Sequence, residues 1–163
     1  MNFLSDMVQR IRSNHAMEHA TINVITEAKP GVRLMGRSSP WGFYIYGPVD
    51  TVDLANAAAA ALARLKLGED ELAVHPACGT NFVVAGMMAG FASFAALGGQ
   101  GRFRKLPQAV AAATMAVLLA QPVGRWAQQR LTTSTDMEGM EIRGITRRSK
   151  GRMNIHFVEL SRE

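Results

Sequence analysis

Two long apolar segments constrain the fold of this chain more than any other feature. Residues 82–99 form an eighteen-residue stretch without a charged side chain, and residues 106–124 form a nineteen-residue one. Each is just long enough, as a helix, to cross a hydrocarbon core of about 30 Å. A chain of 163 residues offers little other protein to bury two helices that are apolar all round. The pattern therefore predicts a transmembrane helical hairpin.

The segments around this hairpin bear on its orientation. The chain starts with an amphipathic stretch of mixed charge that lacks the apolar core of a signal peptide. We therefore expect an inner-membrane protein whose globular part lies in the cytoplasm. The linker of residues 100–105 argues the other way, because its three cations, Arg102, Arg104 and Lys105, favour a cytoplasmic loop.

The rest of the chain predicts an α+β domain that the hairpin interrupts. The expected order is α-β-β-α-β, then the hairpin, then β-β. Asp50 or Thr51 is the expected N-cap of the second helix. The chain is accordingly divided into residues 1–81, 82–124 and 125–163. The predicted elements are helices at 3–27 and 52–65 and strands at 32–36, 42–46, 72–75, 141–147 and 154–160.

The charge distribution indicates a lipid partner. Residues 1–80 hold seven Lys or Arg against eight acids, whereas residues 81–163 hold eleven against five. The basic half is also the half with the apolar segments, which favours anionic lipid headgroups. No basic strand with interleaved aromatic residues is present, so we expect no nucleic acid partner. Cys78 is the only cysteine, which excludes a disulfide framework.

The first helix carries the motif His15-Ala16-Met17-Glu18-His19. Two histidines four residues apart lie one above the other on a helix, about 6 Å apart, a distance that one Zn²⁺ can bridge. The motif also falls in the apolar stripe of this helix, on the face that should be buried. Buried ionisable groups are costly unless they are paired or bind a metal. The stripe consists of Leu4, Val8, Ile11, Ile22 and Ile25.

The HxxEH pattern resembles the signature of the inverzincins, a family of zinc metallopeptidases. The resemblance covers these five residues alone. It implies that His15 and His19 are zinc ligands and that Glu18 is the general base that activates the attacking water. Inverzincins are large, two-lobed proteins with a downstream glutamate as third ligand, and this chain lacks obvious room for such a peptide cleft.

A second motif, His75-Pro76-Ala77-Cys78-Gly79-Thr80-Asn81, precedes the first apolar segment. His75 and Cys78 are close enough along the chain to converge on one ion, and a position near a helix N-terminus favours the thiolate. With His15 and His19 they would form a four-ligand metal site. Together, the His15–Thr21 and His75–Asn81 stretches resemble a small bacterial family of uncharacterised membrane-associated proteins, which implies an architecture but no activity.

Three functions remain open from these residues. The first is a membrane-anchored zinc protein, in its enzymatic form a metallohydrolase that uses Glu18. The second is a non-catalytic assembly or scaffold protein, and the third is a haem or tetrapyrrole protein that uses His15 or His19. Copper and iron are alternatives to zinc, and His156 is a weaker ligand candidate. A GxxxG spacing at Gly86 and Gly90 allows a homo-oligomer or another membrane partner.

Overall fold

The computed structural model describes residues 3–98, 102–150 and 153–162, and it divides into two compact units. One unit comprises the chain up to His75 together with the chain from Gln129 onward, and the other comprises Pro76–Gln128. The second unit thus begins and ends a few residues outside the predicted insertion of residues 82–124.

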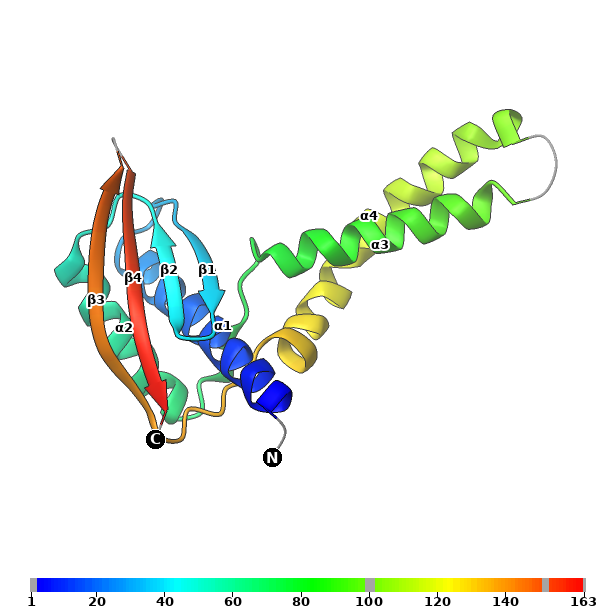
Figure 1. The fold of residues 1–163 in the computed structure, drawn as a ribbon. Coiled ribbons are helices and arrows are strands. Elements are labelled where there is room, and N and C mark those ends of the chain that lie inside the picture. The colour runs from blue at the N-terminus through cyan, green and yellow to red at the C-terminus, as the bar shows by residue number, and fades with distance from the viewer. Residues whose placement is uncertain (1–2, 99–101, 151–152, 163) are drawn as a thin grey trace. The chain divides into compact units, whose positions relative to one another are not determined.

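The first unit is built on a four-stranded antiparallel sheet (Figure 1). The strands are β1 (Met35–Ser39), β2 (Gly42–Tyr46), β3 (Met140–Lys150) and β4 (Met153–Arg162), in the order β1-β2-β4-β3. The pairing of β4 with β2 joins the end of the chain to the first hairpin, with Ile45 opposite His156. This pairing confirms that the last strands join the earlier ones, as an interrupted α+β domain requires.

Two helices pack on one face of this sheet (Figure 1). They are α1 (Phe3–Ala28) and α2 (Thr51–Lys66), and Asp50 is the N-cap of α2 as expected. Alternate strand residues face the helices, so Phe43, Ile45 and Val158 are completely buried. Burial of this kind contributes about 25 cal/mol per Å² of apolar surface and is the main stabilising term of the unit.

Three expectations about this unit were wrong. Residues 72–75 are not a strand, because a 3₁₀ helix, Asp70–Ala73, occupies the first half of this stretch. β1 begins at Met35, three residues after the predicted start, because its pairing with β2 is set by the tight turn that leads into Gly42. The start of the α1 stripe is not buried within the chain, since Leu4 and Val8 are exposed.

The second unit is a pair of helices, α3 (Gly79–Ala96) and α4 (Leu106–Ala127). Both are long and apolar enough to cross a membrane by length and composition. A 3₁₀ helix, Arg102–Lys105, leads into α4, and a π-helix, Gln128–Thr132, follows it. α4 thus continues beyond residue 124, the end of the apolar segment.

The contacts inside this helix pair are made by small and polar residues. On α4 the buried residues are small, whereas large apolar side chains such as Phe91 and Leu118 are exposed. At the base of the pair, Gln128 Nε2 donates to Asn81 Oδ1 over 2.8 Å, and Asn81 Nδ2 donates to the Pro76 carbonyl over 2.8 Å. A side chain at Gly124 would overlap the Asn81 amide. The pair is therefore closed by a buried polar contact that needs a glycine opposite it.

Candidate metal centre

The histidine pair of α1 faces the interior of the first unit. The rings of His15 and His19 lie 4.3 Å apart between centroids, and their ligand nitrogens lie within 4.8 Å of each other. His19 is 2% exposed and Glu18 is 5% exposed, while His15 is partly buried. The expectation that these three side chains point into the domain is confirmed for His19 and Glu18, and it holds in part for His15.

Backbone carbonyls determine which ring nitrogen of each histidine carries the proton. Nδ1 of His15 lies 3.0 Å from the Thr132 carbonyl oxygen, and Nδ1 of His19 lies 2.7 Å from the Ala73 carbonyl oxygen. A carbonyl oxygen only accepts, so Nδ1 must carry the proton in both rings. The neutral form then has its lone pair on Nε2. Histidines that bind metals usually donate their other ring nitrogen to a carbonyl or carboxylate in this way.

The segment before His75 is fastened alongside α1. Asn23, one turn after His19, donates through Nδ2 to the carbonyls of Leu72 (2.9 Å) and Val74 (3.1 Å). With the His19 bond to Ala73, three successive carbonyls are held by one face of α1. This arrangement places the His75 ring 5.8 Å from that of His19, between centroids. The structure thus brings His75 to the helical pair.

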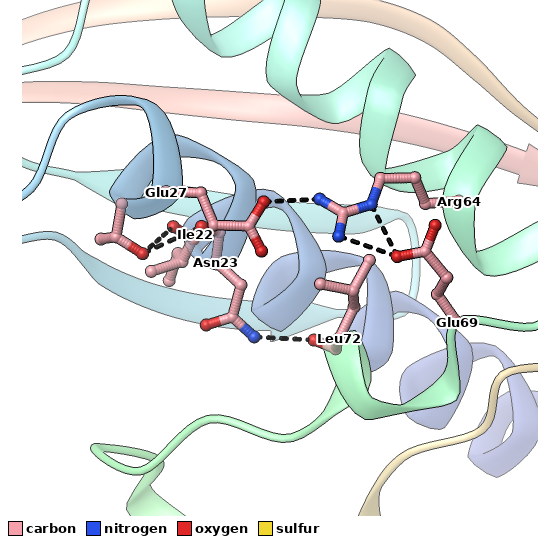
Figure 2. Close-up of polar contacts among 7 residues, drawn as sticks. Ile22, Asn23, Glu27, Arg64, Glu69 and Leu72 are labelled. Carbon is pink, nitrogen blue, oxygen red and sulfur yellow. Dashed lines mark hydrogen bonds and ion pairs between the residues drawn. The ribbon is translucent and has the colours of Figure 1, made fainter.

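An ion-pair network secures the start of this segment (Figure 2). Arg64 of α2 donates from Nε to Glu69 over 2.8 Å and from Nη1 to Glu27 of α1 over 2.6 Å. Figure 2 shows the guanidinium between the two carboxylates, with Asn23 pointing to the Leu72 carbonyl on the same side. The polypeptide leading to His75 is therefore held by both helices.

Burial affects the charge state of His75. It lowers the pKa of this imidazole below its usual value, because the cationic form loses more hydration than the neutral form. A neutral imidazole is the form that binds a metal ion. The environment of His75 therefore favours its ligand form at neutral pH.

Glu18 points in a different direction from the two histidines. Its side chain covers the backbone of Gly36 in β1, where an added Cβ would overlap the carboxylate. The histidines instead contact the residue 72–75 segment and the chain at Thr132. Only a residue without a side chain fits beneath this carboxylate, which explains the glycine in the strand.

Two further candidates belong to other elements of the fold. Cys78 belongs to the second unit, where it is the N-cap of α3 and its sulfur accepts a hydrogen bond from the Thr80 amide over 3.4 Å. His156 lies in the core of the first unit, with Nε2 3.0 Å from Thr51 Oγ1 at the start of α2. This contact places His156 against α2 and away from the other histidines.

Sequence reasoning missed the residues that position the histidines. Asn23 carried a usable signal, because it lies four residues after His19 on the same helix face. Arg12, which donates to the carbonyls of Arg130 and Thr133 over 3.0 Å, carried none. The carbonyls of Ala73 and Thr132 could not be found from side-chain patterns, because any residue supplies them.

These features define a class of protein: an α+β domain with a helical histidine pair, interrupted by two long apolar helices. The chain belongs to the family described as "Domain of unknown function (DUF6391)", which matches residues 10–145. It is 39% identical over 135 residues to an uncharacterised protein of Picosynechococcus sp. (strain ATCC 27264 / PCC 7002 / PR-6), an alignment that covers 76% of this chain and 66% of that relative. The chain thus spans about two thirds of the relative's length. No solved structure matches it.

Proposed function

We propose that this chain is a membrane-anchored zinc-binding protein whose metal is held by His15, His19 and His75. The observation that carries the proposal is the pair of Nδ1–H donations to the Thr132 and Ala73 carbonyls. They orient both rings and leave the Nε2 lone pairs for a metal. A Zn–N bond of about 2.0–2.1 Å requires nitrogens about 3.4 Å apart. The ligand nitrogens of His15 and His19 lie within 4.8 Å of each other, so small rotations would bring this pair onto one ion.

A stable zinc site has a fourth ligand, and we propose the Cys78 thiolate for it. Cys78 follows His75 by three positions, so the chain holds their Cα atoms within about 11 Å of each other. A His₃Cys set with thiolate and imidazole ligands is typical of zinc, which takes tetrahedral N and S ligands. Copper and iron also bind imidazole, and elemental analysis distinguishes the three metals.

A structural role for the metal is favoured because the proposed site joins segments that are far apart in the sequence. The histidines belong to α1 and to the chain before Pro76, and His15 is fixed by a carbonyl of the segment that follows α4. A metal here would cross-link α1 to the chain at His75, sixty residues after His15. The His15 ring also holds the Thr132 carbonyl, 117 residues further along the chain. This form of the proposal describes a scaffold protein rather than an enzyme.

The enzymatic form of the proposal is a zinc hydrolase, with Glu18 as general base. Zinc would supply a water whose pKa is lowered to about 7. Glu18 would take the proton of the attacking water and return it to the leaving amine. What supports this form is a buried carboxylate directly before His19 on the same helix, in the order of the inverzincin pattern. Because the Glu18 carboxylate lies against Gly36, it would have to rotate toward the histidines to act on a zinc-bound water.

Metal analysis of the purified full chain in detergent tests the centre. We expect about one zinc per chain in the wild type, and at least a tenfold loss of affinity in His19→Ala or His75→Ala. His156→Gln is the matched control, because this buried histidine lies against α2, and it should retain the metal. Full metal retention by a His15→Ala, His19→Ala double variant would refute the metal centre. A haem absorption spectrum of the purified protein would contradict zinc and identify a tetrapyrrole as the bound group.

Glu18→Gln separates the two forms of the proposal. In the scaffold form, this variant keeps the metal, the fold and the cellular phenotype of the wild type. In the hydrolase form, it keeps the metal and abolishes hydrolysis of peptide substrates. Replacing Cys78 by serine adds a second distinction, because a closed four-ligand site loses metal in this variant whereas an open three-ligand site keeps it.

We further propose that α3 and α4 span the inner membrane and that the first unit lies on the cytoplasmic side. The support is the exposure of their large apolar side chains, together with their length. Extraction by salt or alkali alone would contradict a spanning hairpin. Reporter fusions at Gln100 and after Glu163 test the orientation, because a fusion at Gln100 should report the side of the membrane opposite the cytoplasm and a fusion after Glu163 the cytoplasmic side.

We also propose that the Gly86 and Gly90 face of α3 supports self-association. An added Cβ at either glycine meets nothing within 4 Å, so neither glycine packs on α4. Close approach of a second helix is what small residues at this spacing allow. Cross-linking in membranes, compared between wild type and Gly86→Leu, tests this contact.

A further inference from the structure

A polar pocket of about 360 Å³ lies beside the histidines within the first unit. Two strips of chain line it, one within residues 70–73 and one within residues 129–135. These are the strips whose carbonyls hold the two histidine rings, since Ala73 accepts from His19 and Thr132 accepts from His15. The pocket therefore shares its walls with the proposed metal centre.

Both walls of the pocket are fixed before any ligand arrives. Arg12 donates to the carbonyls of Arg130 and Thr133 in one wall, each over 3.0 Å. Asn23 donates to the carbonyls on either side of Ala73 in the other wall. A pocket with preformed walls loses little conformational entropy when a ligand binds.

The charges of the lining residues indicate the class of ligand. Asp70 and Glu71 line one wall, and Arg130 lines the other. Among residues 3–98, 102–150 and 153–162, no ion pair occupies either carboxylate or this guanidinium. Thr135 is a further polar residue of the lining. Two carboxylates facing one guanidinium suit a cationic group that has a polar acceptor several ångströms away.

We infer that this pocket binds the free N-terminal end of a short peptide. The ammonium group lies between Asp70 and Glu71, which accept its three N–H donors. Arg130 donates to a peptide carbonyl, and the Thr135 hydroxyl hydrogen-bonds the backbone of the same peptide. This inference deepens the proposed function, because it names the substrate class of the hydrolase form, but the binding itself does not require the metal.

Binding of a tripeptide to the full chain in detergent micelles tests the inference. The probe is Ala-Ala-Ala with a free amine, and the comparison ligand is the same peptide with an acetylated amine. We expect the acetylated peptide to bind at least tenfold more weakly, because it lacks the positive charge. The double variant Asp70→Asn, Glu71→Gln should lose at least tenfold for the free peptide, and Glu141→Gln, an exposed acid on β3, is the matched control.

Two outcomes would overturn the inference. One is equal binding of the free and acetylated peptides, and the other is an unchanged affinity in the double variant. Tighter binding of free alanine than of the tripeptide would replace the peptide by an amino acid and would likewise overturn it. Repeating the titration after chelation separates this result from the metal proposal: binding that survives without zinc supports the pocket alone, and zinc without peptide binding supports the metal centre alone.

Discussion

The two units of this molecule bury opposite kinds of residues. In the first unit the large apolar side chains are inside, as Phe43, Ile45 and Leu54 show. In the second unit the buried positions are small or polar, and large side chains such as Phe91 and Leu118 are outside. The same hydrophobic effect explains both arrangements if the first unit is surrounded by water and the second by lipid.

Polar burial also differs between the units. The first unit buries ionisable groups and fixes them through backbone carbonyls, as with His19 and Ala73. The second unit buries amides that bond to each other, Gln128 to Asn81. An amide pair satisfies itself and closes a helix contact, whereas imidazoles with fixed tautomers offer a lone pair to a ligand. The comparison agrees with the proposals of a metal centre in the first unit and of anchoring by the second.

The largest expected effect comes from a charge placed on the outer face of the second unit. Met87→Arg lies near the middle of α3, at a side chain that is 57% exposed. An arginine at the centre of a spanning helix costs about 2.5–3.5 kcal/mol on insertion scales, which is on the order of a hundredfold in equilibrium. We expect a marked loss of membrane-integrated protein, measured by resistance to alkaline extraction.

The control for this charge is the same substitution in the first unit. Val52 of α2 is 71% exposed, so Val52→Arg faces solvent. A surface substitution of this kind changes stability by no more than about 0.5 kcal/mol, and it should leave membrane integration unchanged. Equal behaviour of the two variants would break the contrast between a unit in lipid and a unit in water.

The next effect concerns the polar contact that closes the helix pair. Gly124→Ala places a Cβ where the Asn81 amide lies, so the amide must leave Gln128 and the Pro76 carbonyl. Loss of buried hydrogen bonds costs about 1–3 kcal/mol. Thermal unfolding in detergent should show the loss. Gly79→Ala, at the start of α3, is the matched control, because its added Cβ meets nothing within 4 Å and should be neutral or slightly stabilising.

Sequence patterns predicted the helices and strands of both units correctly where a segment was long and its apolar spacing was regular. The helices at α1, α2 and α4 and the pairing of the two hairpins followed from apolar spacing and turn residues. The segment after α2 was misassigned, because Leu72 and Val74 suggested a strand although their carbonyls are bound by Asn23 of α1. A short segment whose hydrogen bonds go to a distant side chain carries no periodic signal of its own.

The side chains of the candidate site could be predicted from the sequence, but the backbone groups and contacts that position them could not. The apolar stripe placed His19 inside because a helix face is fixed by its spacing. Nothing in the sequence placed the Ala73 carbonyl beside that ring, because this contact depends on how the whole domain packs. Gly36 illustrates the same limit, since its role is to leave room for Glu18, which lies eighteen residues earlier in the chain.

Gly36→Ala tests a close contact in the first unit, that of Gly36 with the Glu18 side chain, as Gly124→Ala tests the contact with Asn81 in the second. The added Cβ overlaps the Glu18 carboxylate, a side chain that is 5% exposed and has little room to move. Overpacking of this kind costs about 1–3 kcal/mol, and we expect the lower end because a side chain rather than backbone must shift. Chemical denaturation measures the loss. Gly144→Ala, with nothing within 4 Å of its Cβ, is the control, and equal losses in both would contradict the packing of Glu18.

The smallest effect is a pH dependence that the first unit alone should show. His156 is completely buried, and burial together with the nearby charge of Arg147 lowers its pKa from 6.5, against a smaller opposing effect of Asp50. The folded state then binds fewer protons than the unfolded state at this site. Its contribution to stability is therefore present above about pH 6.5 and is lost as the pH falls through that value toward the lower pKa of the folded protein.

The size of this effect is bounded by linkage. One such group changes the free energy of unfolding by at most about 1.4 kcal/mol per pH unit. Denaturation midpoints between pH 5 and 8 should fall toward acid in the wild type and fall less in His156→Gln, which keeps a polar group for Thr51. Parallel curves for the two proteins would show that His156 does not titrate in this range. A shallower dependence in the variant would assign the difference in acid sensitivity to His156, in the core of the first unit.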